Sequence, residues 1–78
     1  MSKETIISDD QLAFSIFCIE NVARAKHVTG TRVYDALTKD SDLLYSYVIP
    51  SYDILHTQSR TYIVDDVLSA LQNKGVSL

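Results

Sequence analysis

The stretch SDDQLAFSIFCIENVARAK, residues 8–26, decides the fold of this chain. Ser8 and Gln11 have the spacing of a capping box, in which each side chain bonds the backbone N–H of the other residue. Asp9 and Asp10 bring negative charge to the first turn, where a helix dipole is positive. The pattern therefore predicts a helix over residues 8–26.

Apolar residues cover most of the circumference of this helix. The inward stripe that we expect, at helical spacing, consists of Leu12, Ile16, Ile19 and Ala23. Ala13 and Phe17 widen it on one side, and Phe14 and Cys18 on the other. A helix this apolar is typical of the centre of a bundle, with the other helices packed around it.

Two helices are expected before the proline. Thr29 is a suitable cap for a helix over residues 30–39, whose expected inward residues are Val33, Tyr34, Ala36 and Leu37. Ser41 is a suitable cap for a second one, whose apolar residues are Leu43, Leu44, Tyr47 and Val48. Pro50 lacks an N–H and disfavours helical angles at Ile49, so we expect a break there.

Two more helices follow the break. A short one is expected over residues 50–57, with Ile54 and Leu55 inward. Ser59 then caps a last helix over residues 60–74, whose inward stripe is Ile63, Val67, Ala70 and Leu71. Gly75 suits the left-handed position that ends many helices.

The fold class that follows is all-α: a compact bundle of four to five short helices around the apolar N-terminal helix. With 78 residues, the chain is expected to form a single domain, residues 1–78, with an ordered core over about 8–75. Only two glycines and one proline interrupt the helical patterns. No strand is expected.

Charge and composition narrow the function classes. Ten acidic and seven basic residues give a net charge of −3, and the bases are scattered, so no nucleic acid is expected as a partner. Cys18 is the only cysteine and is expected to be a buried apolar residue. The chain shows neither a signal-peptide pattern nor a membrane-length apolar run, which favours the cytoplasm and no membrane association.

The segment from Pro50 to Tyr62 carries the most distinctive chemistry. Tyr52, Asp53 and His56 lie within one helical turn, so Asp53 could orient the His56 ring as an acid orients a base. Ser51 and His56 point in different directions on a helix, and no oxyanion loop accompanies them, so we expect no enzyme and no catalytic residue. The alternatives for His56 are a helix-ending role and a contact with a partner.

Five tyrosines are many for a chain of this length. Tyrosine rings are common in interface hot spots, although they also cover the edges of small cores. The candidate partner-binding residues are Tyr45, Tyr52, Asp53, His56, Gln58, Tyr62 and Asp66. The histidine and acid spacings match no metal site, and no cofactor is expected.

The chain resembles a family of small, functionally uncharacterised bacterial domains found mostly in Firmicutes and their mobile elements. The resemblance is carried by four runs: residues 14–25, 33–37, 49–58 and 62–67, the third of which has the pattern Pro-x-Tyr-x-x-Leu-His-Thr-Gln. Genes of that family often lie beside one for an ADP-ribosyltransferase-like protein. The resemblance implies a small partner protein and implies no catalytic residue.

Together these observations predict a non-enzymatic protein-interaction module, an antitoxin-like or accessory partner in a bacterial toxin–antitoxin or conflict system. Its partner would be a protein, for example the product of an adjacent gene. An alternative is a small DNA-binding regulator, since residues 8–37 have the outline of a helix-turn-helix. A phage or mobile-element inhibitor of a host system is a third reading, and the sequence leaves a homodimer open.

Overall fold

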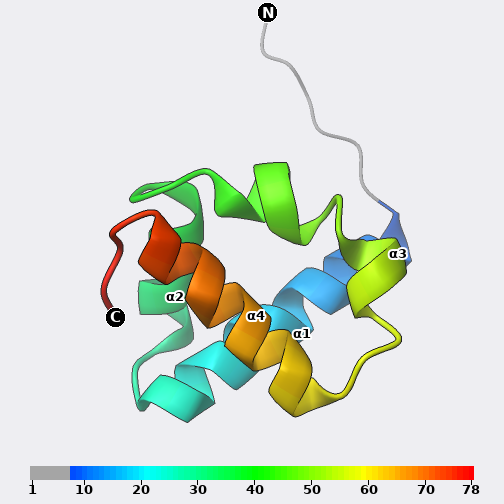
Figure 1. The fold of residues 1–78 in the computed structure, drawn as a ribbon, viewed down its shortest axis with the longest axis horizontal. Coiled ribbons are helices and arrows are strands. Elements are labelled where there is room, and N and C mark those ends of the chain that lie inside the picture. The colour runs from blue at the N-terminus through cyan, green and yellow to red at the C-terminus, as the bar shows by residue number, and fades with distance from the viewer. Residues whose placement is uncertain (1–7) are drawn as a thin grey trace, which may run out of the picture.

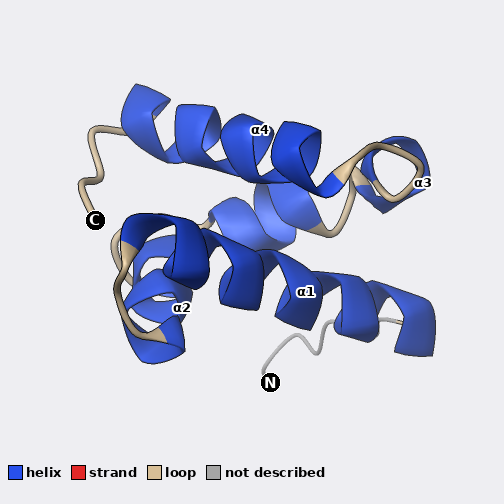
Figure 2. Cartoon of the chain, turned by 90° about the horizontal axis from the view of Figure 1, so that it is seen from below, coloured by secondary structure: helices blue, strands red, loops and turns tan. Residues whose placement is uncertain are grey.

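The computed structural model describes residues 8–78. Along the chain these residues form α1 (Asp9–Lys26), α2 (Gly30–Thr38), the π-helix η1 (Leu44–Val48), α3 (Tyr52–Leu55) and α4 (Arg60–Asn73). Every regular element in this part of the chain is helical, which confirms the predicted all-α bundle. α1 packs chiefly against α2 and α4. Figure 1 shows α4 crossing α1, and Figure 2 shows α2 at one end of α1 and α3 at the other.

Both ends of α1 are closed by backbone and side-chain hydrogen bonds. The predicted capping box is present: Ser8 Oγ accepts from the Gln11 N–H at 3.1 Å, and Gln11 Oε1 accepts from the Ser8 N–H at 3.1 Å. At the other end, the Val28 N–H donates to the Ala23 carbonyl at 3.0 Å. His27 lies between them in the left-handed region, with φ 58°. This is a Schellman ending with histidine in the position that glycine usually takes.

The buried side of α1 differs from the predicted stripe. Phe14, Cys18 and Val22 face the core, whereas Leu12 and Ile16 are exposed. The expectation that Leu12 and Ile16 point inward is therefore wrong. The buried side also carries the small side chains of Ser15 and Ala23. Ser15 stays satisfied because its hydroxyl donates to the Gln11 carbonyl at 2.9 Å.

α2 matches its prediction except at Tyr34. Thr29 Oγ1 accepts from the Arg32 N–H at 3.1 Å and caps the helix. Val33, Ala36 and Leu37 are buried, but Tyr34 is exposed. Tyr34 is 44 % exposed, so its predicted inward position is wrong.

Pro50 ends η1, as predicted, but by a different route. The Ile49 N–H donates to the Leu44 carbonyl at 3.0 Å, which is the wider spacing of a π-helix. Ile49 keeps helical angles (φ −65°, ψ −47°), contrary to the prediction. The π-helix thus ends before Pro50, so no helical hydrogen bond is needed from proline, which has no N–H group.

α3 is shorter than predicted, and only one of its two expected inward residues is buried. It spans Tyr52–Leu55 rather than residues 50–57. Leu55 is buried, whereas Ile54 is 71 % exposed, so the inward prediction for Ile54 is wrong. A single turn of helix lying against α1 offers only one buried position, and Leu55 fills it.

α4 agrees with its prediction at both ends. Ser59 Oγ accepts from the Tyr62 N–H at 3.1 Å. Gly75 is left-handed, with φ 77°, and the Val76 N–H returns to the Leu71 carbonyl at 3.0 Å, a second Schellman ending. Of the predicted stripe, Ile63, Val67 and Leu71 are buried and Ala70 is half-buried.

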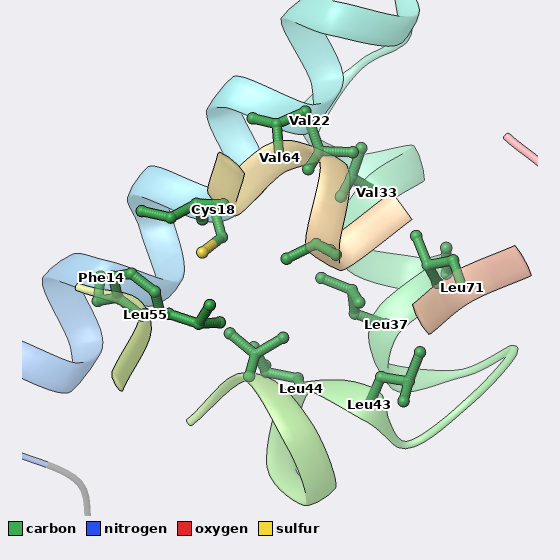
Figure 3. Close-up of a cluster of buried hydrophobic side chains, with 14 of the residues drawn as sticks. Phe14, Cys18, Val22, Val33, Leu37, Leu43, Leu44, Leu55, Val64 and Leu71 are labelled. Atoms are coloured by element: carbon green, nitrogen blue, oxygen red, sulfur yellow. The ribbon is translucent and has the colours of Figure 1, made fainter. Parts of the chain in front are cut away.

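The core lies between α1, α2 and α4 and is closed by η1 and α3. Figure 3 shows Cys18 of α1 with its sulfur directed into this cluster, opposite Leu44 of η1 and close to Leu55 of α3. The largest side chains buried almost completely are Leu37, Leu71, Val22, Val33, Val48 and Val67. The burial of Leu55 in this cluster holds α3 against the other helices of the core.

Candidate functional site

The clearest local constellation is the pair Tyr52 and His56 on α3. Their rings stack with centroids 4.3 Å apart and an interplanar angle of 11°. His56 Nδ1 lies 2.6 Å from the backbone carbonyl oxygen of Tyr52. Because a carbonyl oxygen only accepts, the neutral ring must carry its proton on Nδ1, which leaves Nε2 as an acceptor.

Asp53 does not orient the His56 ring. Within the described residues no hydrogen bond or ion pair joins the two, and the ring nitrogen that an orienting acid would hold is bonded to Tyr52. The predicted Asp53–His56 pair is therefore wrong, because the Tyr52 carbonyl at the end of α3 is the closer acceptor. Thr57 Oγ1 likewise donates to the Ile54 carbonyl at 3.0 Å, so both side chains help to end this helix.

An aromatic row connects α3 to α1. The Phe14 ring meets the Tyr52 ring edge-on, with centroids 5.5 Å apart and an interplanar angle of 76°. On α1 itself, the Phe14 and Phe17 rings stack at 6.5 Å. We call Phe17, Phe14, Tyr52 and His56 the aromatic row. Phe14 is buried and fixes the row, whereas Phe17 and His56 are exposed at its two ends.

The row borders an exposed apolar surface on α1 that the sequence analysis placed in the core. We define the outer face of α1 as Leu12, Ala13, Ile16 and Phe17, all of which are exposed. These positions are neighbours at three- and four-residue spacing, so their side chains form one patch. The signal for such a patch was in the sequence, because an apolar residue on every side of a helix means that some side must meet solvent.

A second polar cluster lies between η1 and α4. The Tyr47 hydroxyl donates a short hydrogen bond to Asp66 Oδ2, and both residues are half-buried. This bond is the main cause that raises the pKa of Tyr47 to about 12; burial, the Asp66 charge and Tyr62 add to it. Asp66 is therefore bonded within the fold, and the residue that holds it, Tyr47, was absent from the predicted set. From the sequence, Tyr47 was named only as one of the apolar residues of the helix before Pro50.

The predicted candidates thus separate into groups. Tyr52 and Asp53 belong to α3, His56 is the C-terminal cap of this helix, and Gln58 is exposed in the turn that follows. Tyr62 and Asp66 lie one turn apart on α4, beside Tyr47. Tyr45 is exposed on η1, and among the described residues no side-chain hydrogen bond or stacked ring joins it to either group. Their role in binding stays a prediction.

Cys18 is a buried apolar residue, as predicted. Its side chain is inaccessible to solvent, and burial, assisted by the negative charge of Asp66, raises the pKa of its thiol to about 12. A thiol that ionises so late is a poor nucleophile near neutral pH.

The charged side chains outside these clusters form no arrangement that suggests a binding site as clearly as the aromatic row does. A hollow of about 420 Å³ between α1 and α4 is lined in part by Arg24, Arg60 and Asp65, whose charges partly cancel. On α2, Arg32 is bonded to Asp40 at 3.1 Å and to the Ser77 carbonyl at 2.5 Å. Over residues 8–78 no three His, Cys, Asp or Glu side chains come together as metal ligands would, and no helix is long and apolar enough to span a membrane.

A family model described as "Protein of unknown function (DUF3791)" matches residues 13–74. The chain belongs to the DUF3791 family. No curated protein and no solved structure matches it. The matched range of this DUF3791 chain contains the whole aromatic row and all seven candidate residues. Since the family description assigns no activity, the function of the DUF3791 chain has to be argued from these surfaces.

Proposed function

We propose that this DUF3791 chain is a non-enzymatic protein-interaction module that binds its partner through the aromatic row. The observation that carries the proposal is the fixed geometry of the row. Phe14 is buried, Tyr52 is held edge-on against it, and His56 is both stacked on Tyr52 and bonded to its carbonyl. Rings held in this way lose little conformational freedom when a partner covers them, which favours binding.

The chemistry of His56 supports a contact role over catalysis. Nδ1 is occupied by the backbone of its own helix, and Asp53 does not reach it. Nε2 remains an acceptor on an exposed ring and suits a hydrogen bond from a partner's N–H or O–H group. A binding residue needs no more than this, whereas a general base needs a substrate proton within reach.

The partner that we propose is a protein encoded close by, so that the chain acts as an antitoxin-like or accessory component of a bacterial conflict system. This step rests on the resemblance to small domains encoded beside ADP-ribosyltransferase-like proteins. A phage or mobile-element inhibitor of a host system would use the same surface in the same way. The identity of the partner separates these two cases.

A DNA-binding regulator is the second candidate. α1, the turn after it and α2 have the helix-turn-helix outline that favours this reading. Base reading by α2 would depend on Arg32 near its start, but the Arg32 guanidinium already bonds Asp40 and the Ser77 carbonyl. We therefore rank this candidate below the protein-interaction module.

The test is an affinity capture of the tagged chain from its native cells, with mass spectrometry of the bound proteins. We expect one protein in a fixed ratio to the bait, and we expect the double variant Phe17→Ser with His56→Ala to lose it. The matched control is Tyr34→Ser, which removes an exposed aromatic from α2 on a different surface. Both variants should keep the wild-type circular dichroism spectrum.

Two results would overturn the proposal. If the folded double variant retains the protein as well as wild type, the aromatic row is not the contact site. If nuclease-sensitive DNA is retained instead of a protein, the regulator candidate replaces the module.

A further inference from the structure

The outer face of α1 is an apolar patch with no cover in the described structure. Leu12 is 49 % exposed, Ile16 47 % and Phe17 37 %, and Ala13 lies among them. Figure 2 shows α1 along one side of the molecule and α4 along the opposite side. Single exposed apolar residues are ordinary, but a contiguous patch on a small domain marks a contact surface.

Negative charge surrounds this patch. Asp9 and Asp10 lie at the start of α1, Glu20 lies one turn after Ile16, and Asp53 is exposed on α3 beside the aromatic row. Residues 8–23, which include the whole patch, contain no lysine or arginine. The first base along α1 is Arg24, beyond Glu20. The patch therefore has an acidic rim.

We propose that the outer face of α1, extended by the aromatic row, binds an amphipathic α-helix of the partner protein whose apolar stripe is flanked by lysine or arginine. This inference rests on the proposed function and names the chemistry of the partner. Helices bind such surfaces by presenting apolar anchors at spacings of three, four and seven residues. The flanking cations would meet Asp9, Asp10 and Glu20, which favours rapid association and correct orientation.

The dimensions agree with a helical ligand. The span from Leu12 to Phe17 covers about 8 Å along α1, and the aromatic row continues the surface toward α3 at one edge. An anchor side chain of the ligand can thus rest on Leu12 and Ile16 while a second reaches Phe17. A partner helix of three turns, roughly 11 residues and about 16 Å long, spans this distance with residues to spare at both ends.

A second copy of this chain fits the patch poorly. In an antiparallel pair centred on the patch, Leu12 of one copy faces Phe17 of the other, and the same register sets Asp9 against Glu20 twice. In a parallel pair each acid faces its own copy. Both two-fold arrangements bring like charges together, which is destabilising. An anionic membrane surface is disfavoured for the same reason.

The experiment uses a synthetic probe and residue-level mapping. A peptide of about 18 residues, patterned from leucine and lysine as an amphipathic helix, is titrated into the isotope-labelled chain and followed by two-dimensional NMR. We expect shifts of the backbone signals of residues 12–17 and of Tyr52 and His56, with an affinity that falls as salt rises. A peptide with glutamate in place of lysine should bind at least about tenfold more weakly.

Matched variants locate the contact. Leu12→Ser with Ile16→Ser removes half-exposed side chains from the patch and should weaken the lysine peptide at least about tenfold. Ile54→Ser makes the same change at the 71 % exposed isoleucine of α3 and should leave the affinity unchanged. Glu20→Lys should weaken binding by several-fold, whereas Asp65→Lys on α4 should have little effect.

Each contrary outcome points to a different error. Equal binding of the acidic peptide would overturn the charge argument, and equal loss in Ile54→Ser would overturn the placement. If sedimentation shows a dimer that the Ile16→Ser substitution dissociates, the patch binds a second copy of the chain. If phosphatidylserine vesicles shift the same NMR signals, the patch binds a membrane. If the peptide leaves the patch unshifted while affinity capture still yields a partner, the protein-interaction module stands and this inference alone fails.

Discussion

The two Schellman endings allow a sharp prediction, because one holds glycine at the left-handed position and the other holds histidine. His27 has φ 58°, and Gly75 has φ 77°. A side chain in this region costs about 1–2 kcal/mol, since Cβ approaches the following carbonyl oxygen. Replacing histidine by glycine relieves that strain but gives the unfolded chain more freedom, which costs about 0.4–1 kcal/mol.

We therefore expect His27→Gly to raise the free energy of unfolding by about 0.5–1 kcal/mol. The His27 ring is exposed, so its removal loses little packing. For a domain of this size, such a gain raises Tm by about 2–8 °C. Urea unfolding followed by circular dichroism measures it, and the m-value should not change, because both states keep their exposed surface.

Two controls isolate the backbone as the cause. His27→Ala keeps a Cβ and should give no gain, whereas Gly75→Ala should lose about 1 kcal/mol. A Cβ added at Gly75 would meet no atom within 4 Å, so that loss reports backbone strain alone. If His27→Ala stabilises the chain as much as His27→Gly, the histidine ring is responsible and the reasoning about φ is refuted.

The remaining predictions concern the Tyr47–Asp66 bond and the core. Tyr47→Phe should destabilise the chain by about 1–2 kcal/mol at pH 8, because half-buried Asp66 loses its donor. The pKa of Tyr47 is raised from 10 to about 12 in the folded chain. The stability that wild type gains over Tyr47→Phe is therefore full below pH 10 and is lost as the pH rises through 12. The urea midpoints of the two proteins should converge across that range, and a constant difference would contradict the assignment. Leu37→Ala should cost about 3 kcal/mol, since Leu37 is fully buried, whereas Ile54→Ala should cost less than about 0.5 kcal/mol; comparable losses in thermal melts would show that the core is misplaced.

Local signals predicted the ends of α1, α2 and α4 well, but the prediction that Ser41 caps the next helix is wrong. The N-cap of η1 is Leu43, without a side-chain cap, and the Ser41 hydroxyl donates instead to the Ala36 carbonyl at 2.8 Å. Ser8, Thr29 and Ser59 each accept a hydrogen bond from the first turn of the helix that they cap. Gly75 is left-handed as predicted. These features depend on a few neighbouring residues, so sequence spacing suffices to find them.

Features that depend on tertiary packing were predicted less well. The π-helical turn of η1 and the helical angles of Ile49 depend on how this segment packs before Pro50, and a short stretch of sequence does not specify that packing. The Tyr47–Asp66 bond joins residues 19 positions apart. The candidate site could be predicted only in part. The helical spacing placed His56 beside Tyr52, whereas the contact of Phe14 with Tyr52 depends on how α1 and α3 pack.

The error on α1 has a physical cause that bears on function. Periodicity reports an apolar side, but α1 has apolar residues on every side, so the packing of the other helices decides which residues are buried. α1 packs chiefly against α2 and α4, and its buried side carries Phe14, Cys18 and Val22. Leu12, Ile16 and Phe17 stay exposed, although the Phe17 ring also stacks on the buried Phe14. Large apolar side chains that the fold leaves exposed, with acids around them, are what the proposed contact with a basic partner helix requires.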